Sequence, residues 1–274
     1  MKWALALLLF FGLALADEVK VYAAGDIAYC NLAGDEATAR LIQELAPKDA
    51  PWWVLALGDL AYPKGSREEF ERCYHPSWGA FFTRTYPVPG NHEYYTKDAA
   101  GYYGYFGPGA HPPGGYYRFE LAGWTLYALN SNCHAAGCEK GSRQYRWLKE
   151  ELARDPNACQ LAFMHHPRYS SGVHGESKKV DPLWRLLVAA GVELVLAGHD
   201  HHYERLLPVP GTRLFVVGTG GAPLRKLKNL AAGSERAVVG EWGVLELTLF
   251  SGGYRFRFIN TRGEVLDEGE GRCG

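Results

Sequence analysis

Side chains that can bind metal ions or move protons recur in short motifs along the chain. The motifs are Gly25-Asp26, Gly58-Asp59, Gly90-Asn91-His92-Glu93, His165 and Gly198-His199-Asp200-His201. Their carboxylate, amide and imidazole groups form a mixed donor set that suits iron, zinc or manganese better than a thiolate site. Two such cations about 3.5–4 Å apart can clamp the attacking and leaving oxygens of a phosphoryl displacement. A carboxylate can serve two cations, so Asp59 is the natural bridge between them.

Apolar segments precede these motifs and are predicted to be β-strands. They are residues 19–26, 52–59, 86–89, 161–164 and 192–197. Ligand sites in open α/β sheets gather beyond the carboxyl ends of strands. Glycine at those turns lets the backbone and a metal ion approach each other closely. We therefore expect the motif side chains to meet in one pocket, although they are far apart in the sequence.

The remaining segments alternate between helix and strand first and are mainly strands later. A helix is predicted after Asp35, and another after Ser142, whose side chain can cap it. A hairpin turning at Ala122-Gly123 and the alternating residues 245–258 predict further strands. Residues 101–115 are rich in Gly, Pro and Tyr and are predicted to be a loop. The pattern predicts an α/β fold with a β-rich C-terminal part.

The first residues have the features of a secretory signal peptide. Lys2 precedes a run without charge, residues 3–16, that is too short for a membrane span, and Ala14-Leu15-Ala16 fits a cleavage site. We predict a signal peptide at residues 1–16 and one catalytic domain at residues 17–274 of a secreted or periplasmic protein. A buried N-terminal strand or a retained anchor is the alternative.

Charge and cysteine content narrow the class of protein further. The formal net charge is −1, so nothing indicates a nucleic-acid groove or an acidic membrane surface as partner. No later segment is long and apolar enough to predict stable membrane insertion. The chain has 6 cysteines, and an even number in an exported protein favours disulfide bonds. Cys133 and Cys138 close a short loop and are the first pair we expect.

The motifs resemble those of the calcineurin-like metallophosphoesterases, and the resemblance covers residues 25–201. Ala28 stands where that family has a histidine ligand, while Tyr62 stands where purple acid phosphatases have a tyrosine bound to ferric iron. The segment from Gly198 to Arg205 is also similar to the last motif of that subfamily. The resemblance implies a four-layer sandwich, in which two mixed β-sheets pack face to face between helices.

The same resemblance implies a set of site residues. The ferric ion would be held by Asp26, Asp59, Tyr62 and His201. A second divalent metal (Fe, Zn or Mn) would be held by Asp59, Asn91, His165 and His199. His92 and His174 would face the substrate as catalytic groups. Alternatives remain at several positions: Tyr62 as a packed aromatic, His174 as a solvated loop residue, and His166 and His202 as supporting or packing residues.

The resulting expectation is a binuclear metal-dependent phosphatase. It would hydrolyse phosphate monoesters of small molecules by attack of a metal-bound hydroxide, at acidic pH, with His92 as general acid. One alternative is a phosphodiesterase of the same family, acting on cyclic nucleotides or phospholipid headgroups. Another is a non-catalytic binding protein with a retained fold. The oligomeric state and the substrate are left open by the sequence.

Overall fold

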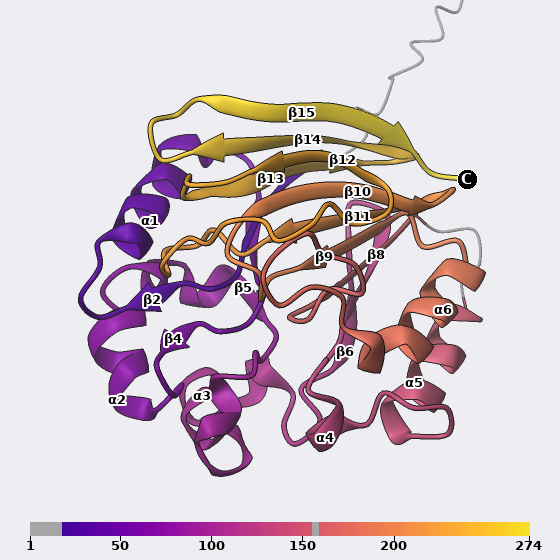
Figure 1. Cartoon of the computed structure of the whole chain (residues 1–274), viewed down its shortest axis with the longest axis horizontal. Helices are drawn as coiled ribbons and strands as arrows, with labels where there is room; N and C mark the ends of the chain where they lie inside the picture. The colour runs from indigo at the N-terminus through magenta and orange to yellow at the C-terminus, as the bar shows by residue number, and fades with distance from the viewer. Residues whose placement is uncertain (1–17, 155–158) are drawn as a thin grey trace, which may run out of the picture.

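Two mixed β-sheets form the centre of the computed structural model, which describes residues 18–154 and 159–274 (Figure 1). The first has the order β15-β14-β13-β1-β3-β5, and the second β12-β10-β11-β9-β8-β7-β6. The strands of the first sheet are β1 (Val19–Ala24), β3 (Trp52–Ala56), β5 (Thr85–Pro87), β13 (Gly243–Phe250), β14 (Gly253–Asn260) and β15 (Val265–Arg272). Those of the second are β6 (Tyr117–Leu121), β7 (Trp124–Ala128), β8 (Cys159–Met164), β9 (Leu194–Ala197), β10 (Tyr203–Val209), β11 (Thr212–Val217) and β12 (Ser234–Val238).

Helices and a small extra sheet connect these strands. The α-helices are α1 (Gly34–Leu45), α2 (Arg67–Glu69), α3 (Ala100–Phe106), α4 (Cys133–Ala136), α5 (Arg143–Leu152) and α6 (Asp181–Ala189). A π-helical turn covers Phe70–Tyr74, and 3₁₀ turns cover Trp78–Arg84, Glu93–Tyr95, Lys97–Ala99, Gly107–Ala110 and Lys178–Val180. The short strands β2 (Ala28–Tyr29) and β4 (Ala61–Tyr62) pair in parallel. This small sheet lies beside the strand ends that carry the motifs.

The inner faces of the two large sheets share one apolar core. Tyr203 of β10 stacks on Phe258 of β14 with ring centroids 4.0 Å apart. Phe215 of β11 meets Phe256 of β14 at 5.0 Å. These residues are buried and belong to one cluster that draws on strands of both sheets. Apolar area removed from water between the sheets is therefore the main force that holds them face to face.

Helices cover the outer faces of both sheets. On the first sheet, the Tyr22 hydroxyl of β1 donates to the carbonyl of Leu45 at the end of α1, at 2.9 Å. On the second, Leu148 of α5 and Leu187 of α6 share a buried cluster with Val195 of β9. Figure 1 shows α5 and α6 together on one side of that sheet. The expected arrangement of two mixed sheets with flanking helices is confirmed.

Local predictions from periodicity and capping are mostly confirmed. The helix after Asp35 is α1, and the Ser142 side chain accepts from the Tyr145 amide at the start of α5. The hairpin β6–β7 turns at Ala122 and Gly123, which both have positive φ. β13 and β14 form the alternating pair near the C-terminus. In each case the local pattern and the tertiary fold favour the same conformation.

The prediction of a loop at residues 101–115 is wrong for its first half. This half forms α3 and the following 3₁₀ turn, Gly107–Ala110. Tyr102 and Phe106 lie on one face of α3, are buried, and pack against Phe70 with ring centroids 6.4 and 5.9 Å away. Burial of these aromatic rings outweighs the poor helix propensity of glycine. A Cβ at Gly101 would lie 2.0 Å from the Gly65 carbonyl, so close packing requires glycine there.

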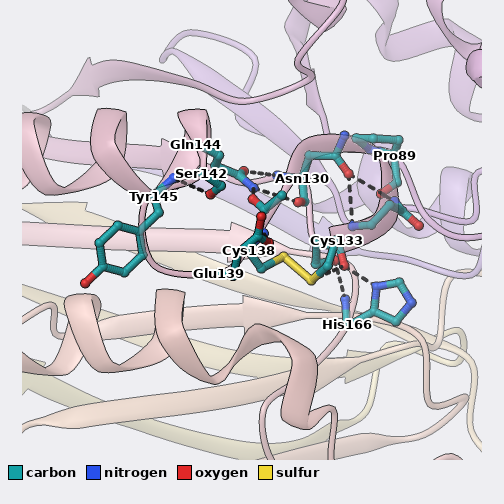
Figure 2. The surroundings of a disulfide bond; sticks show 12 residues. Pro89, Asn130, Cys133, Cys138, Glu139, Ser142, Gln144, Tyr145 and His166 are labelled. Carbon is teal, nitrogen blue, oxygen red and sulfur yellow. Dashed lines mark hydrogen bonds between the residues drawn. A yellow bond between two sulfur atoms is a disulfide. The ribbon is translucent and has the colours of Figure 1, made fainter.

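Disulfide bonds join all 6 cysteines. The expected pair Cys133–Cys138 is confirmed, and the other pairs are Cys30–Cys73 and Cys159–Cys273. Figure 2 shows that Cys133–Cys138 closes the segment between β7 and α5. Within this segment Nδ2 of the Asn132 side chain donates to the Pro89 carbonyl at 3.0 Å. The disulfide loop is thereby tied to the turn that presents Asn91 and His92.

In the part of the chain that the structure describes, no helix has both the length and the apolar character needed to cross a membrane. The predicted signal peptide, residues 1–16, lies outside the described residues.

Candidate metal centre

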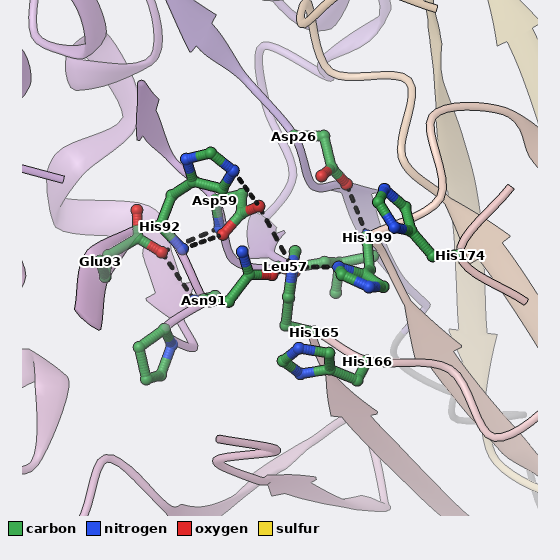
Figure 3. A network of polar contacts seen from close by, with 12 residues as sticks. Asp26, Leu57, Asp59, Asn91, His92, Glu93, His165, His166, His174 and His199 are labelled. Atoms are coloured by element: carbon green, nitrogen blue, oxygen red, sulfur yellow. Dashed lines mark hydrogen bonds and ion pairs between the residues drawn. The ribbon is translucent and has the colours of Figure 1, made fainter. Parts of the chain in front are cut away.

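The motif side chains leave the ends of strands from both sheets and point toward one another (Figure 3). Asp26 follows β1, Asp59 follows β3, Asn91 follows β5, His165 follows β8 and His199 follows β9. These strands run parallel within each sheet, so their carboxyl ends lie at one edge of the sandwich. The fold thus brings together groups from distant parts of the chain, as the strand-end pattern predicts.

A first group of donors surrounds the hydroxyl of Tyr62. This oxygen lies 2.9 Å from Oδ1 of Asp26, 3.2 Å from Oδ2 of Asp59 and 3.3 Å from Nε2 of His201. His201 Nε2 is also 3.2 Å from Oδ1 of Asp26. Four donor side chains therefore converge on one point. The Tyr62 hydroxyl is turned into this group, and Ala28 contributes no polar side chain.

A second group surrounds Nε2 of His165. This nitrogen lies 3.1 Å from Oδ1 of Asn91, 3.2 Å from Nδ1 of His199 and 3.3 Å from Oδ2 of Asp59. The side chains of His165 and Asp59 are nearly or fully buried. Oδ2 of Asp59 belongs to both groups, which makes this carboxylate their junction.

The donor chemistry of this structure fits a pair of cations. Asp26, Asp59 and His165 bring ligand atoms within 4.8 Å of one another, and all three are buried. Buried carboxylates are costly in free energy unless each charge is paired or binds a metal ion. Cations would supply that partner, because oxygen and nitrogen donors of this kind bind iron, zinc and manganese.

Glycines and unusual backbone conformations make the convergence possible. Asp26, Asp59 and His199 have φ of 59°, 51° and 72°, in the left-handed region. Such conformations cost free energy at residues with a Cβ, and they are found where function demands a fixed side-chain direction. A Cβ added to Gly90 would lie 2.1 Å from Oδ1 of Asp59, and one on Gly58 would lie 2.7 Å from Nδ1 of His165. Only glycine fits at these two positions.

Backbone carbonyls orient two of the imidazoles. Nδ1 of His165 lies 2.9 Å from the Leu57 carbonyl, and Nδ1 of His201 lies 2.6 Å from the Pro223 carbonyl. A carbonyl can only accept, so Nδ1 carries the hydrogen in both rings. Nε2 of each ring is then free to bind a cation within its donor group, which is how ligand tautomers are usually set in metal sites.

Charge interactions between the donor side chains shift their pKa values. Burial disfavours the charged form of His165, but the Asp59 and Asp26 carboxylates outweigh it and raise the His165 pKa to about 9. Burial, with His165 and His166 nearby, lowers the pKa of His199 to about 2. Burial and the two carboxylates raise the pKa of Tyr62 well above its usual value. A cation bound here would therefore replace protons on Tyr62 and His165.

His92 lies at the mouth of the site and is partly accessible. Its Nδ1 donates to the Pro63 carbonyl at 2.6 Å, and its Nε2 lies 3.8 Å from Oδ2 of Asp59. The ring packs on Tyr62 and Tyr95, with centroids 4.4 and 4.8 Å away. The side chain is 26 % exposed, so Nε2 can meet a bound molecule.

His174 lies on the other side of the site in Figure 3. Its ring is 4.5 Å from that of His199 between centroids, and its Nε2 accepts from Nη1 of Arg225 at 3.0 Å. His174 thus borders the donor groups, and its side chain is exposed. His166 lies beside the second donor group, because a ring nitrogen of His166 is within 4.8 Å of nitrogens of His165 and His199, while its Nδ1 lies 2.9 Å from Oγ of Ser131. His202 is buried, and its Nε2 lies 3.2 Å from Oε2 of Glu204.

Glu93 is a supporting residue whose function the sequence did not reveal. It is fully buried, and its carboxylate accepts from the amides of Asp59 and Leu60 at 2.9 Å each and of Gly90 at 2.6 Å. It therefore connects the turn after β3 with the turn after β5. Its place in Gly90-Asn91-His92-Glu93 was the available signal, but two of the partner amides, those of Asp59 and Leu60, come from another motif.

Comparison with known proteins places the chain among phosphoesterases. The sequence model of the calcineurin-like phosphoesterase family matches residues 19–203. Purple acid phosphatase 21 of Arabidopsis thaliana is 29% identical over 223 residues, which are 70% of this chain and 48% of that protein. Tartrate-resistant acid phosphatase type 5 of Oryctolagus cuniculus is 25% identical over 222 residues, covering 69% of this chain and 67% of that one. The chain spans about half the length of the Arabidopsis relative.

Solved structures agree at the level of the fold. The purple acid phosphatase PPD1 from yellow lupin (Lupinus luteus) seeds has a TM-score of 0.73 at 20% identity, covering 93% of this chain and 54% of that chain. GAP50 of Plasmodium, described as the anchor in the inner membrane complex, has a TM-score of 0.71 at 16% identity, covering 94% and 89%. One fold therefore serves both a phosphatase and a protein described as an anchor, so function has to be argued from the site.

Proposed function

Because the chain belongs to the calcineurin-like phosphoesterase family, we propose that it is a secreted, binuclear metal-dependent phosphatase that hydrolyses phosphate monoesters. Its resemblance to purple acid phosphatases supports this choice within the family. The observation that carries the proposal is the position of Asp59, whose Oδ2 lies within 3.3 Å of donors from both groups. A single shared carboxylate between two donor groups is the arrangement that a cation pair requires.

The donor types suggest how two different metals would be divided. Asp26, Asp59, Tyr62 and His201 offer carboxylate and phenol oxygens, which suit a ferric ion. Asp59, Asn91, His165 and His199 offer more neutral donors, which suit divalent iron, zinc or manganese. The cations would activate a water molecule and neutralise the charge that builds on the phosphate.

The side chains around the donors would bind the ester and move a proton. Pro63 holds Nδ1 of His92, so Nε2 of His92 is the nitrogen that faces the ester. As general acid, His92 would transfer the Nε2 proton to the departing alkoxide. A cavity of about 280 Å³ is lined in part by Tyr62 and Pro63, which both contact His92. Its other lining residues include Tyr29, Asn31, Glu68 and Arg72. It offers room for the organic part of a small ester.

Export is part of the same proposal. The three disulfide bonds are of the kind that persist in oxidising compartments, and the first residues have the signal-peptide pattern described above. Fractionation of the producing cells, followed by N-terminal sequencing of the exported protein, tests it. We expect a mature N-terminus near Asp17. Retention of the protein inside the cell with an intact N-terminus would contradict this part.

Metal analysis and hydrolysis assays on the purified protein test the enzymatic part. We expect iron with a broad visible absorption band, and faster turnover of p-nitrophenyl phosphate than of bis-p-nitrophenyl phosphate. Faster turnover of the diester would instead favour a phosphodiesterase. Absence of metal, or metal without hydrolysis of either ester, would favour a non-catalytic binding protein and contradict the proposal. The Asp49→Asn variant, which changes an exposed carboxylate, is a matched control for changes at Asp59.

A further inference from the structure

The loop between β11 and β12, residues 218–233, carries a basic segment to the edge of the metal centre. The segment is Arg225-Lys226-Leu227-Lys228. Its backbone is anchored at His201: the Arg225 amide donates to the His201 carbonyl at 3.0 Å, and the Pro223 carbonyl accepts from Nδ1 of His201 at 2.6 Å. The Cα of Arg225 is therefore positioned by a residue of the first donor group.

A second set of hydrogen bonds ties this loop to the segment that carries His174. The amides of Lys228 and Ala231 donate to the carbonyl and to Oγ of Ser171, both at 2.8 Å. Ser171 in turn donates through its amide at 2.9 Å, and through its hydroxyl, to the buried carboxylate of Glu204. Glu204 also accepts from Oγ of Ser234 at 2.6 Å. The two loops are thus held as one unit on β10.

The side chain of Arg225 is exposed but held in place. Nη1 donates to Nε2 of His174 at 3.0 Å. Across residues 18–154 and 159–274, no carboxylate forms an ion pair with Arg225, whereas Arg205 pairs with both Asp267 and Glu235. A guanidinium has five N–H donors and only one is used here, so the others are available for an anion.

The position of this guanidinium relative to the donors indicates which part of a substrate it would meet. His199 belongs to the second donor group, and the ring of His174 packs on His199 in a tilted arrangement with centroids 4.5 Å apart. Arg225 is bonded to Nε2 of His174. His92, the candidate proton donor, lies on the opposite side of the pocket, against Tyr62. A phosphate at the donor groups would thus have His92 on one side and the Arg225 cation on the other.

We propose that Arg225 binds a second phosphate of the substrate, next to the phosphate that is cleaved. The proposal rests on the proposed phosphatase function and names its substrate class: phosphate esters or anhydrides that carry another phosphate close to the scissile one. Guanidinium binds phosphate through paired, charge-assisted hydrogen bonds, which makes arginine well suited to this position. His174 is a positioning residue here, since it holds Nη1 and leaves the remaining donors free.

Substrate comparison in the Arg225→Ala variant tests the proposal. The substrates are p-nitrophenyl phosphate, with one phosphate, adenosine diphosphate, with phosphates joined by an anhydride, and 2,3-bisphosphoglycerate, with phosphates on neighbouring carbons. We expect kcat/KM for a two-phosphate substrate to fall about 10- to 100-fold more than for p-nitrophenyl phosphate. If kcat/KM falls for adenosine diphosphate alone, Arg225 binds the second phosphate of an anhydride. If it falls for 2,3-bisphosphoglycerate as well, Arg225 also binds a phosphate ester on a neighbouring carbon. An equal loss on all three substrates, or no loss on any, would overturn the proposal.

Further variants distinguish the effect of the Arg225 guanidinium on substrate discrimination from the effects of neighbouring groups. Arg225→Lys keeps the charge but loses the paired geometry and should recover part of the discrimination. Arg236→Ala removes an exposed arginine that donates to the Leu266 carbonyl of β15, and should leave all three substrates unaffected. His174→Ala keeps the guanidinium, so some discrimination should remain. If His174→Ala and Arg225→Ala abolish it equally, Arg225 acts only by holding His174, and the proposal is wrong.

A binding measurement distinguishes failure of this inference from failure of the proposed function. Titration calorimetry of the metal-loaded protein with inorganic pyrophosphate and with orthophosphate needs no turnover. We expect Arg225→Ala to weaken pyrophosphate binding about tenfold or more relative to orthophosphate. This result would stand even if no ester were hydrolysed. Equal weakening of both anions, or of neither, would exclude a second phosphate position at Arg225.

Discussion

The two donor groups share Asp59 but differ in the charge that they can offer. The group around Tyr62 combines two carboxylates, a phenol and one imidazole, whereas the group around His165 combines one shared carboxylate, an amide and two imidazoles. Hard, anionic oxygens stabilise a cation of higher charge, and imidazoles with an amide suit a divalent one. The difference teaches that one pocket can offer donor sets of different charge to two cations.

The pKa values of the donor side chains add to this difference between the two groups. In the group around Tyr62, burial and the carboxylates raise the phenol pKa, so the full negative charge exists only once a cation displaces the proton. In the group around His165, His199 has a pKa of about 2 and is already neutral. The first group therefore reaches its full negative charge only when it binds a strongly Lewis-acidic cation. A less acidic cation is enough for the second group.

Replacement of the shared carboxylate should have the largest effect. Asp59→Asn removes the negative charge that both groups use, so both metals should bind weakly. We expect activity to fall on the order of 10³-fold or more, because transition-state charge loses its stabilisation. Metal content and p-nitrophenyl phosphate turnover measure it, with Asp49→Asn as control. Retention of one metal at full occupancy would show that the two groups do not depend on Asp59 equally.

Loss of the phenol should affect one group only. Tyr62→Phe should abolish the visible ferric-phenolate band and weaken ferric binding on the order of 100-fold, while the divalent metal remains. Absorption spectra and metal analysis of the same samples measure both effects. Tyr29→Phe is the matched control, since Tyr29 stacks on Tyr62 with centroids 5.4 Å apart but does not enter the donor group. A band that survives in Tyr62→Phe means that another residue binds the iron.

Replacement of Glu93 should weaken metal binding by both donor groups, but less than the changes at Asp59 and Tyr62 do. Glu93→Gln keeps the size of the side chain but replaces one of its two accepting oxygens by an NH2 group, which cannot accept. Either the Leu60 amide or the Asp59 and Gly90 amides then lose their acceptor. We expect affinity for each metal to fall about 10- to 100-fold, as for other residues that orient ligands. Glu69→Gln, which affects a cap at α2, is the control. If only one metal is lost, Glu93 supports one turn and not both.

The smallest effect we expect is a difference in pH dependence. His165 has a pKa of about 9, so below that pH a cation must displace its proton, and affinity should rise by up to about tenfold per pH unit until pH approaches 9. In the other group, burial disfavours the charged form of His201, but Asp26 outweighs it and raises the His201 pKa, and Tyr62 must also lose a proton. Ferric binding should therefore release more protons. Calorimetry in buffers of different ionisation enthalpy measures the release, and equal release at both groups would contradict the comparison.

Much of the fold and of the pocket could be predicted from local sequence. Strands such as β1 and β9 are followed by Gly and then a polar residue, and the rule for the carboxyl ends of strands then brings Asp26 and His199 to one edge. The failure at residues 101–115 has a tertiary cause, because Tyr102 and Phe106 form a helix only where Phe70 offers a surface to pack against. The glycine-rich composition of residues 101–115 gives no information about this packing surface.

The sequence by itself determined which donor types are present and that they follow strands, because glycine turns and apolar runs are local features. It also determined the resemblance from which the division into two ligand sets follows. Only the tertiary structure decided that Glu93 bridges two turns and that Arg225 meets His174, since both contacts join segments from different parts of the chain. Hydrogen bonds across such separations leave no periodic or compositional mark, so they are settled by how the two sheets and their loops pack.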